Sequence, residues 1–87
     1  MFRAFYMTKV TLLTTKSCPV CPSAKRLWAD VRKDHKFDYE ELDALSPKGQ
    51  DLVERLGIMS VPTTLVNGKV AFTGVPDKNK AIALVSK

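Results

Sequence analysis

The two cysteines constrain this chain more than any other feature of its sequence. Cys18 and Cys21 are the only cysteines, and two residues separate them just before an amphipathic helical pattern. At that spacing the two sulfurs can meet across one helical turn, either as a disulfide or as an exposed thiol backed by a second thiol. Because such a disulfide closes a very short loop, it is poorly suited to stabilising the fold, and the pair favours redox chemistry.

Length and composition predict one small domain. The 87 residues leave no room for a second hydrophobic core, so we expect a single domain over residues 1–87. Residues 1–8 include a candidate N-terminal extension, because Met7 is a second candidate start. Small secreted domains usually add several disulfides, whereas this chain has one cysteine pair at most. That usage fits a thiol-reducing interior, and we expect a cytoplasmic protein.

Composition also disfavours several other classes of function. No apolar run approaches the roughly 20 residues of a membrane span. The net charge of +5 comes from basic residues scattered along the chain, without a recognised nucleic-acid-binding motif. Zinc needs about four ligands, and the chain offers two cysteines and the distant His35. A zinc or iron–sulfur site would therefore need a dimer that shares ligands. We expect a monomer with no cofactor and with no nucleic-acid or membrane partner.

The first half of the chain predicts a strand, a helix and a second strand. Val10–Thr14 is mostly apolar and predicts a buried strand. After the cysteines, an apolar stripe recurs at helical spacing and includes Trp28, which we expect in the core. Phe37–Leu42 predicts the second strand by its alternation.

The second half predicts a helix, a hairpin and a last helix. Ser46 is suited to cap a helix that Pro47 begins and Gly57 ends. Asn67-Gly68, between two apolar segments, favours a type I′ turn between strands Thr63–Val66 and Lys69–Phe72. Asp77 is suited to cap the last helix. The order predicts an α/β fold: a mixed four-stranded sheet flanked by three helices on its two faces.

The position of the cysteines suggests separate roles for them. We expect Cys18 at the start of the helix, where the positive end of the helix dipole favours its thiolate. Pro19 suits the first helical position, and Lys16 adds a nearby positive charge that helps to lower the pKa of Cys18. We expect Cys18 to be exposed and to attack. Cys21, one turn further on, should be more buried and should resolve the mixed disulfide.

Three segments of the chain form a recognisable set: Cys18-Pro19-Val20-Cys21-Pro22 with its following residues, Gly57 to Thr63 with its Val61-Pro62 pair, and Asn67-Gly68 followed by Phe72 to Pro76. Together they resemble the thioredoxin superfamily, and within it the short archaeal thioredoxins. The resemblance covers residues 9–87, almost the whole chain.

The resemblance implies a thioredoxin-like fold and a protein disulfide reductase. Pro62 should follow a cis peptide bond and face Cys18, and Val61 should offer its backbone to an extended substrate segment. Pro19 and Val20, between the cysteines, should also contact substrate. Cys18 should attack disulfide-containing target proteins, and Cys21 should release them. A thioredoxin reductase or an equivalent electron donor should then reduce the Cys18–Cys21 disulfide.

The chain departs from the patterns of larger thioredoxins and of glutaredoxins. Residues 9–15 contain no acid, so the buried aspartate that lies beneath the second cysteine in larger thioredoxins is missing. The segment Gly74-Val75-Pro76-Asp77 keeps one glycine and one aspartate of the glutathione-holding pattern of glutaredoxins, but Val75 and Pro76 break that pattern. A glutathione-dependent glutaredoxin therefore stays an alternative to the disulfide reductase.

Overall fold

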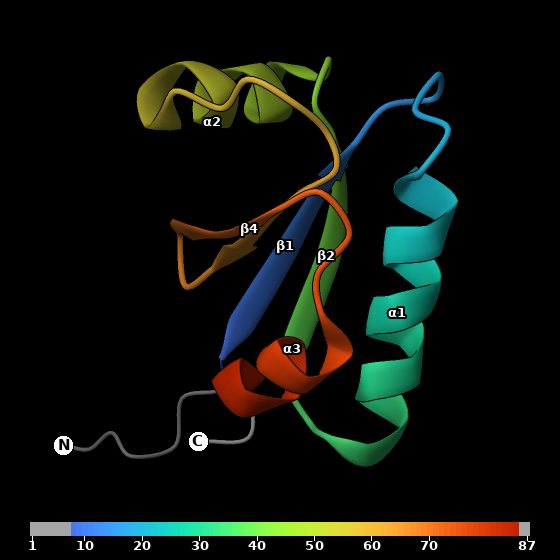
Figure 1. The fold of residues 1–87 in the computed structure, drawn as a ribbon. Coiled ribbons are helices and arrows are strands. Elements are labelled where there is room, and N and C mark those ends of the chain that lie inside the picture. Colours follow the sequence, from blue (N-terminus) through green and yellow to red (C-terminus); the bar gives the residue numbers. More distant parts are fainter. Residues whose placement is uncertain (1–7, 86–87) are drawn as a thin grey trace, which may run out of the picture.

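A four-stranded mixed sheet forms the centre of the protein in the computed structural model, which describes residues 8–85 (Figure 1). The sheet order is β2-β1-β3-β4. The central strand β1 is parallel to β2 and antiparallel to β3, and β3 is antiparallel to β4. The predicted mixed sheet is confirmed. The strands are β1 (Lys9–Thr14), β2 (Asp38–Asp43), β3 (Thr63–Val66) and β4 (Lys69–Thr73).

The helices cover both faces of the sheet. Helices α1 (Cys21–Asp34) and α3 (Lys78–Val85) pack together on one face, and α2 (Pro47–Leu56) lies on the other (Figure 1). The main core lies between the sheet and the α1–α3 face, and Trp28 is completely buried there, as predicted. Its indole Nε1 donates a hydrogen bond to Thr64 Oγ1 at 3.2 Å. The buried members of this core are Val10, Leu12, Ala24, Trp28, Val31, Phe37, Ala81 and Val85.

Local signals in the second half of the sequence form the structures that they predict. Asn67 and Gly68 have φ angles of 53° and 83°, so both occupy the left-handed region that a type I′ turn requires. Ser46 caps α2 by accepting a hydrogen bond from the Gly49 N–H at 3.1 Å, and Gly57 ends that helix with a φ of 67°. The side chain of Asp77 accepts from the Asn79 N–H at the start of α3.

Element bounds differ slightly from those expected. Strand β2 runs from Asp38 to Asp43, one residue later than predicted, and β4 extends one residue further, to Thr73. The candidate N-terminal extension lies outside the described residues except for Thr8. Within residues 8–85, no helix is long and apolar enough to cross a membrane.

Candidate active site

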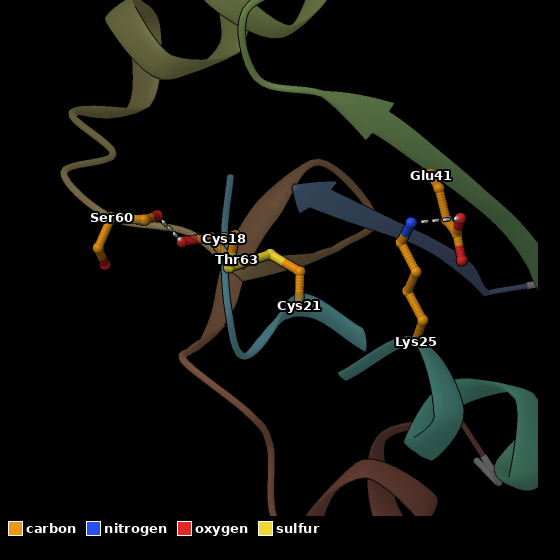
Figure 2. The surroundings of a disulfide bond; sticks show 6 residues. All are labelled: Cys18, Cys21, Lys25, Glu41, Ser60 and Thr63. Carbon is orange, nitrogen blue, oxygen red and sulfur yellow. Dashed lines mark hydrogen bonds and ion pairs between the residues drawn. A yellow bond between two sulfur atoms is a disulfide. The ribbon is translucent and has the colours of Figure 1, made fainter. Parts of the chain in front are cut away.

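Cys18 and Cys21 form a disulfide beyond the end of β1 (Figure 2). The Cys18 N–H donates to the Thr15 carbonyl at 3.3 Å in the turn that leads from β1 toward α1. The two Cα atoms are 5.5 Å apart. Cys18 is partly exposed, whereas Cys21 is only 2% exposed. The pair therefore consists of a solvent-accessible cysteine, Cys18, and a buried cysteine, Cys21.

Helix α1 begins at Cys21, so the predicted start at Cys18 is wrong. Val20 is the N-cap residue, and its carbonyl accepts hydrogen bonds from the Ser23 and Ala24 N–H groups at 3.1 and 3.3 Å. Pro19 consequently lies before the helix and not at its first position. Pro22 lies in the first helical turn, where its missing N–H would have had no partner within the helix. The Cys18 sulfur still lies at this helix end, because it is bonded to the first helical residue.

The segment before β3 lies beside the disulfide. Thr63 pairs with Leu13, next to the end of β1, and this pairing brings the residues that precede β3 to the cysteine end of the sheet. Figure 2 draws Ser60 and Thr63 among the surroundings of the disulfide. The Val61–Pro62 peptide bond is cis, as the resemblance implied. The Pro62 side chain is fully buried, and Val61 is half-buried.

Two hydrogen bonds hold the carbonyls on either side of Val61. Thr63 Oγ1 donates to the Ser60 carbonyl at 2.7 Å (Figure 2), and the Gly74 N–H donates to the Pro62 carbonyl at 2.8 Å. Gly74 has a φ of 85°, a conformation that favours glycine. Within residues 8–85, no hydrogen bond to the N–H or C=O of Val61 is present.

An ion pair lies on the other side of the disulfide. Lys25, one helical turn after Cys21, lies 3.8 Å from a carboxylate oxygen of Glu41 on β2 (Figure 2). The Tyr39 hydroxyl donates to the same carboxylate at 2.8 Å. Burial, and then the hydrogen bond to Glu41, raise the pKa of Tyr39 well above its ordinary value of 10.0. Tyr39 therefore stays protonated and remains a hydrogen-bond donor at neutral pH.

Apolar side chains are exposed in the segments around the disulfide. Val20, between the cysteines, is 47% exposed, and Met59, two residues before Val61, is 95% exposed. Val61 and Met59 also line an apolar groove of about 450 Å³ that extends to Leu45 on the loop before α2. The grouping of Leu45, Met59 and Val61 along this groove is typical of a surface that contacts another molecule.

The residues predicted for the site lie in two segments, one around the cysteines and one just before β3. Cys18 and Cys21 are bonded to each other, and the Val61–Pro62 segment precedes the strand beside them. Pro19 and Val20 are exposed between the cysteines, and Lys16 is exposed in the turn before Cys18.

Sequence reasoning missed two pairs around the disulfide, Lys25 with Glu41 and Thr63 with Ser60. The spacing of Lys25 from Cys21 was a usable signal, because residues four apart share a helix face. Nothing in the sequence marked the hydrogen bond between Thr63 and Ser60. Among residues 8–85, no group of three or more histidine, cysteine or acidic side chains is arranged to hold a metal ion.

Comparisons with known proteins connect this geometry to one family. The thioredoxin domain family matches residues 8–86. A thioredoxin from Methanocaldococcus jannaschii is 36% identical over 80 residues, which cover 91% of this chain and 93% of the relative. A probable thioredoxin from Archaeoglobus fulgidus is 30% identical over 81 residues, covering 93% of this chain and 89% of the relative. The chain is thus nearly the same length as these archaeal relatives.

Solved structures share the fold. A mutant thioredoxin from Halobacterium salinarum superposes with a TM-score of 0.74 at 15% identity, covering 93% of this chain and 74% of that one. A protein disulfide oxidoreductase from Aeropyrum pernix superposes with a TM-score of 0.69 at 26% identity. That match covers 92% of this chain and 36% of the larger protein.

Proposed function

The chain belongs to the thioredoxin domain family, and from this premise we propose how its cysteine pair works. It is a thiol–disulfide oxidoreductase that cycles Cys18 and Cys21 between a dithiol and a disulfide. Proteins of this family act on disulfide-containing substrates and receive electrons from a reductase. The observation that carries the proposal is the disulfide itself, with one partly exposed and one buried cysteine.

The unequal exposure of the cysteines supports an order of events. The Cys18 thiolate attacks one sulfur of the target disulfide, which forms a mixed disulfide and releases the first target thiolate. The Cys21 thiolate then attacks the Cys18 sulfur, forming the internal disulfide and releasing the second target thiolate. Two electrons pass to the target, and its two thiolates take up two protons. Cys21 is suited to the second step because its burial keeps it from outside disulfides.

Stabilisation of the Cys18 thiolate is proposed to come from the start of α1 and from Lys16. In the oxidised form, the Cys18 sulfur is bonded to the first residue of that helix, where the positive end of the helix dipole favours an anion. Lys16 lies two residues before Cys18 and is exposed, so it can adjust its position toward a thiolate. Together these charges favour the reactive form of Cys18 at neutral pH.

Substrate contact is assigned to the two segments that flank the disulfide. The unpaired N–H and C=O of Val61 are suited to receive an extended target segment in the manner of an added strand. Pro62 is proposed to face Cys18 and to form the floor of this contact. Pro19 and Val20 present exposed surface on the other flank. Exposed Met59 enlarges the apolar part of this surface.

The cellular setting remains part of the proposal. We expect one domain that acts as a monomer in the cytoplasm, with a thioredoxin reductase or an equivalent enzyme as the electron donor. The single cysteine pair supports the cytoplasmic location, because thiol-reducing compartments use such pairs for catalysis.

Reduction of insulin by dithiothreitol tests the proposed function. The protein should accelerate the precipitation of the reduced insulin B chain at catalytic concentrations. A rate equal to that of dithiothreitol alone would refute the disulfide reductase. A parallel assay with glutathione and a glutathionylated peptide addresses the glutaredoxin alternative, and fast turnover in that assay alone would favour it.

Single cysteine variants test the two roles. Cys18→Ser should abolish insulin reduction, because no attacking thiolate remains. Cys21→Ser should still form the mixed disulfide but should not resolve it, so mass spectrometry should detect a covalent adduct with a disulfide-bonded substrate. If Cys18→Ser formed the adduct and Cys21→Ser did not, the assigned roles would be reversed.

A further inference from the structure

Hydrogen bonds hold the backbone on both sides of Val61. The Ser60 carbonyl on one side is held by Thr63 Oγ1 at 2.7 Å, and the Pro62 carbonyl on the other side is held by the Gly74 N–H at 2.8 Å. One of these bonds comes from the backbone and cannot be removed by changing a side chain. The other depends on a single hydroxyl group, that of Thr63.

The sheet fixes the position of that hydroxyl. Thr63 is the first residue of β3, and it pairs with Leu13 on one side and Thr73 on the other. Its side chain is only 2% exposed, so water cannot readily replace the hydrogen bond to the Ser60 carbonyl. Ser60 itself is exposed and lies outside the regular elements. The hydroxyl therefore connects a rigid strand to an exposed loop.

We propose that Thr63 is a positioning residue for substrate binding. Its hydroxyl holds the Ser60 carbonyl and so keeps the N–H and C=O of Val61 oriented toward the target segment. This inference rests on the proposed function, because it concerns how the disulfide reductase binds its targets. Thr63 takes no part in bond making at sulfur. Its loss should weaken the binding of protein substrates and leave the reactivity of the cysteines unchanged.

Two substrates of different size separate these effects. Insulin presents a chain segment on each side of its disulfides, whereas 5,5′-dithiobis(2-nitrobenzoate) is a small disulfide with no peptide chain to pair with Val61. Thr63→Val keeps the shape of the side chain and removes the hydroxyl. It should raise the KM for insulin about three- to tenfold, the range expected for the loss of one hydrogen bond. The kcat for insulin and the reaction rate of the pre-reduced protein with the small disulfide should stay unchanged.

Two further variants serve as controls. Thr63→Ser keeps a hydroxyl at this position, so its KM for insulin should lie within about twofold of the original value. Thr11→Val changes another buried threonine of the sheet, for which no side-chain hydrogen bond is present within residues 8–85, and it should leave the KM unchanged. If Thr63→Val does not fold, Thr63→Ala removes the same hydroxyl without placing a methyl group against the Ser60 carbonyl.

The outcomes are distinguishable. A raised KM for insulin alone, restored by serine, supports the positioning role. An equal loss with both substrates, no change with either, or a failure of serine to restore the KM would overturn it. In each of these cases the original protein still reduces insulin, so the proposed function stands. An original protein that does not reduce insulin refutes the proposed function and this inference together.

Discussion

At the scale of single residues, the start of α1 is where the sequence is hardest to interpret. Pro19 suits the first helical position, and this match put the predicted start of the helix at Cys18. The structure begins the helix at Cys21, because the Val20 carbonyl is the one that accepts the first helical hydrogen bonds. Of the two prolines, only Pro22 therefore lies in the helix, and Cys18 stays in the turn before it.

The ion pair of Asp30 with Lys78 gives a pH-dependent prediction. The hydrogen bond and the charge of Lys78 hold the pKa of Asp30 below its ordinary value of 3.8. A lowered pKa in the folded state stabilises the fold above pH 3.8, and this contribution is lost as the pH falls through the lowered pKa. Asp30→Asn should therefore slightly lower the thermal midpoint at pH 7, and the difference should shrink as the pH falls below 3.8 and through the lowered pKa.

Thermal melts monitored by circular dichroism at several pH values would measure this difference. The exposed Asp38, for which no ion pair is present among residues 8–85, provides the control variant Asp38→Asn. If the difference between the original protein and Asp30→Asn grew toward acidic pH, the charged form of Asp30 would not be the stabilising one.

At the scale of elements, capping residues predicted α2 well because their signals are local. Ser46, Pro47 and Gly57 each act on the backbone within a few positions, so the sequence contains the whole interaction. The role of Gly49 could not be predicted in this way. It is the only buried residue of α2, and it lies against the backbone of Asp43 and Ala44. That contact arises from the packing of the chain, which local patterns do not contain.

Gly49→Ala tests this close approach. A Cβ atom at residue 49 would lie 2.8 Å from the Ala44 Cα and 2.9 Å from the Asp43 carbonyl carbon. Helix propensity alone would make alanine stabilising by about 1 kcal/mol. We expect the steric contact to dominate and to lower the free energy of unfolding by about 1–3 kcal/mol, as measured by urea denaturation. Gln50→Ala, at the exposed neighbouring position, should have little effect. A stabilised Gly49→Ala variant would show that the backbone yields easily.

At the scale of the whole molecule, the order of elements predicted the sheet but not its details. A parallel pair around α1 and a hairpin with an Asn-Gly turn are enough to expect a mixed sheet of four strands. The irregularity between Thr64 and Leu65 in the pairing of β3 with β4 had no sequence signal. The cis bond before Pro62 followed from resemblance alone. The segments of the candidate site are far apart in sequence, and only the pairing of β3 with β1 brings them together.

Thr64→Val tests the connection between α1 and the sheet. Thr64 and Trp28 are completely buried, and the threonine hydroxyl accepts the indole hydrogen bond at 3.2 Å. Valine keeps the volume but leaves the indole N–H without a partner, which should cost about 1–3 kcal/mol of unfolding free energy. Urea denaturation would measure this loss, and Thr11→Val provides the matched control. The double variant Thr64→Val with Trp28→Phe should lose less unfolding free energy than the sum of the two single losses, whereas purely additive losses would exclude a coupled pair.

The short span of the disulfide limits how much oxidation can stabilise the fold. The two cysteines are three positions apart, so oxidation closes a very small ring. In a loop-entropy description, such a ring restricts the unfolded ensemble by about 2 kcal/mol, compared with about 4.7 for a loop of 100 residues. Most of the chain therefore explores the same unfolded conformations in both oxidation states. The buried cluster around Trp28 contains neither cysteine. In this description, oxidation shifts the folding equilibrium by about 2 kcal/mol, less than half the effect of the longer loop, and it adds no contact to the main core.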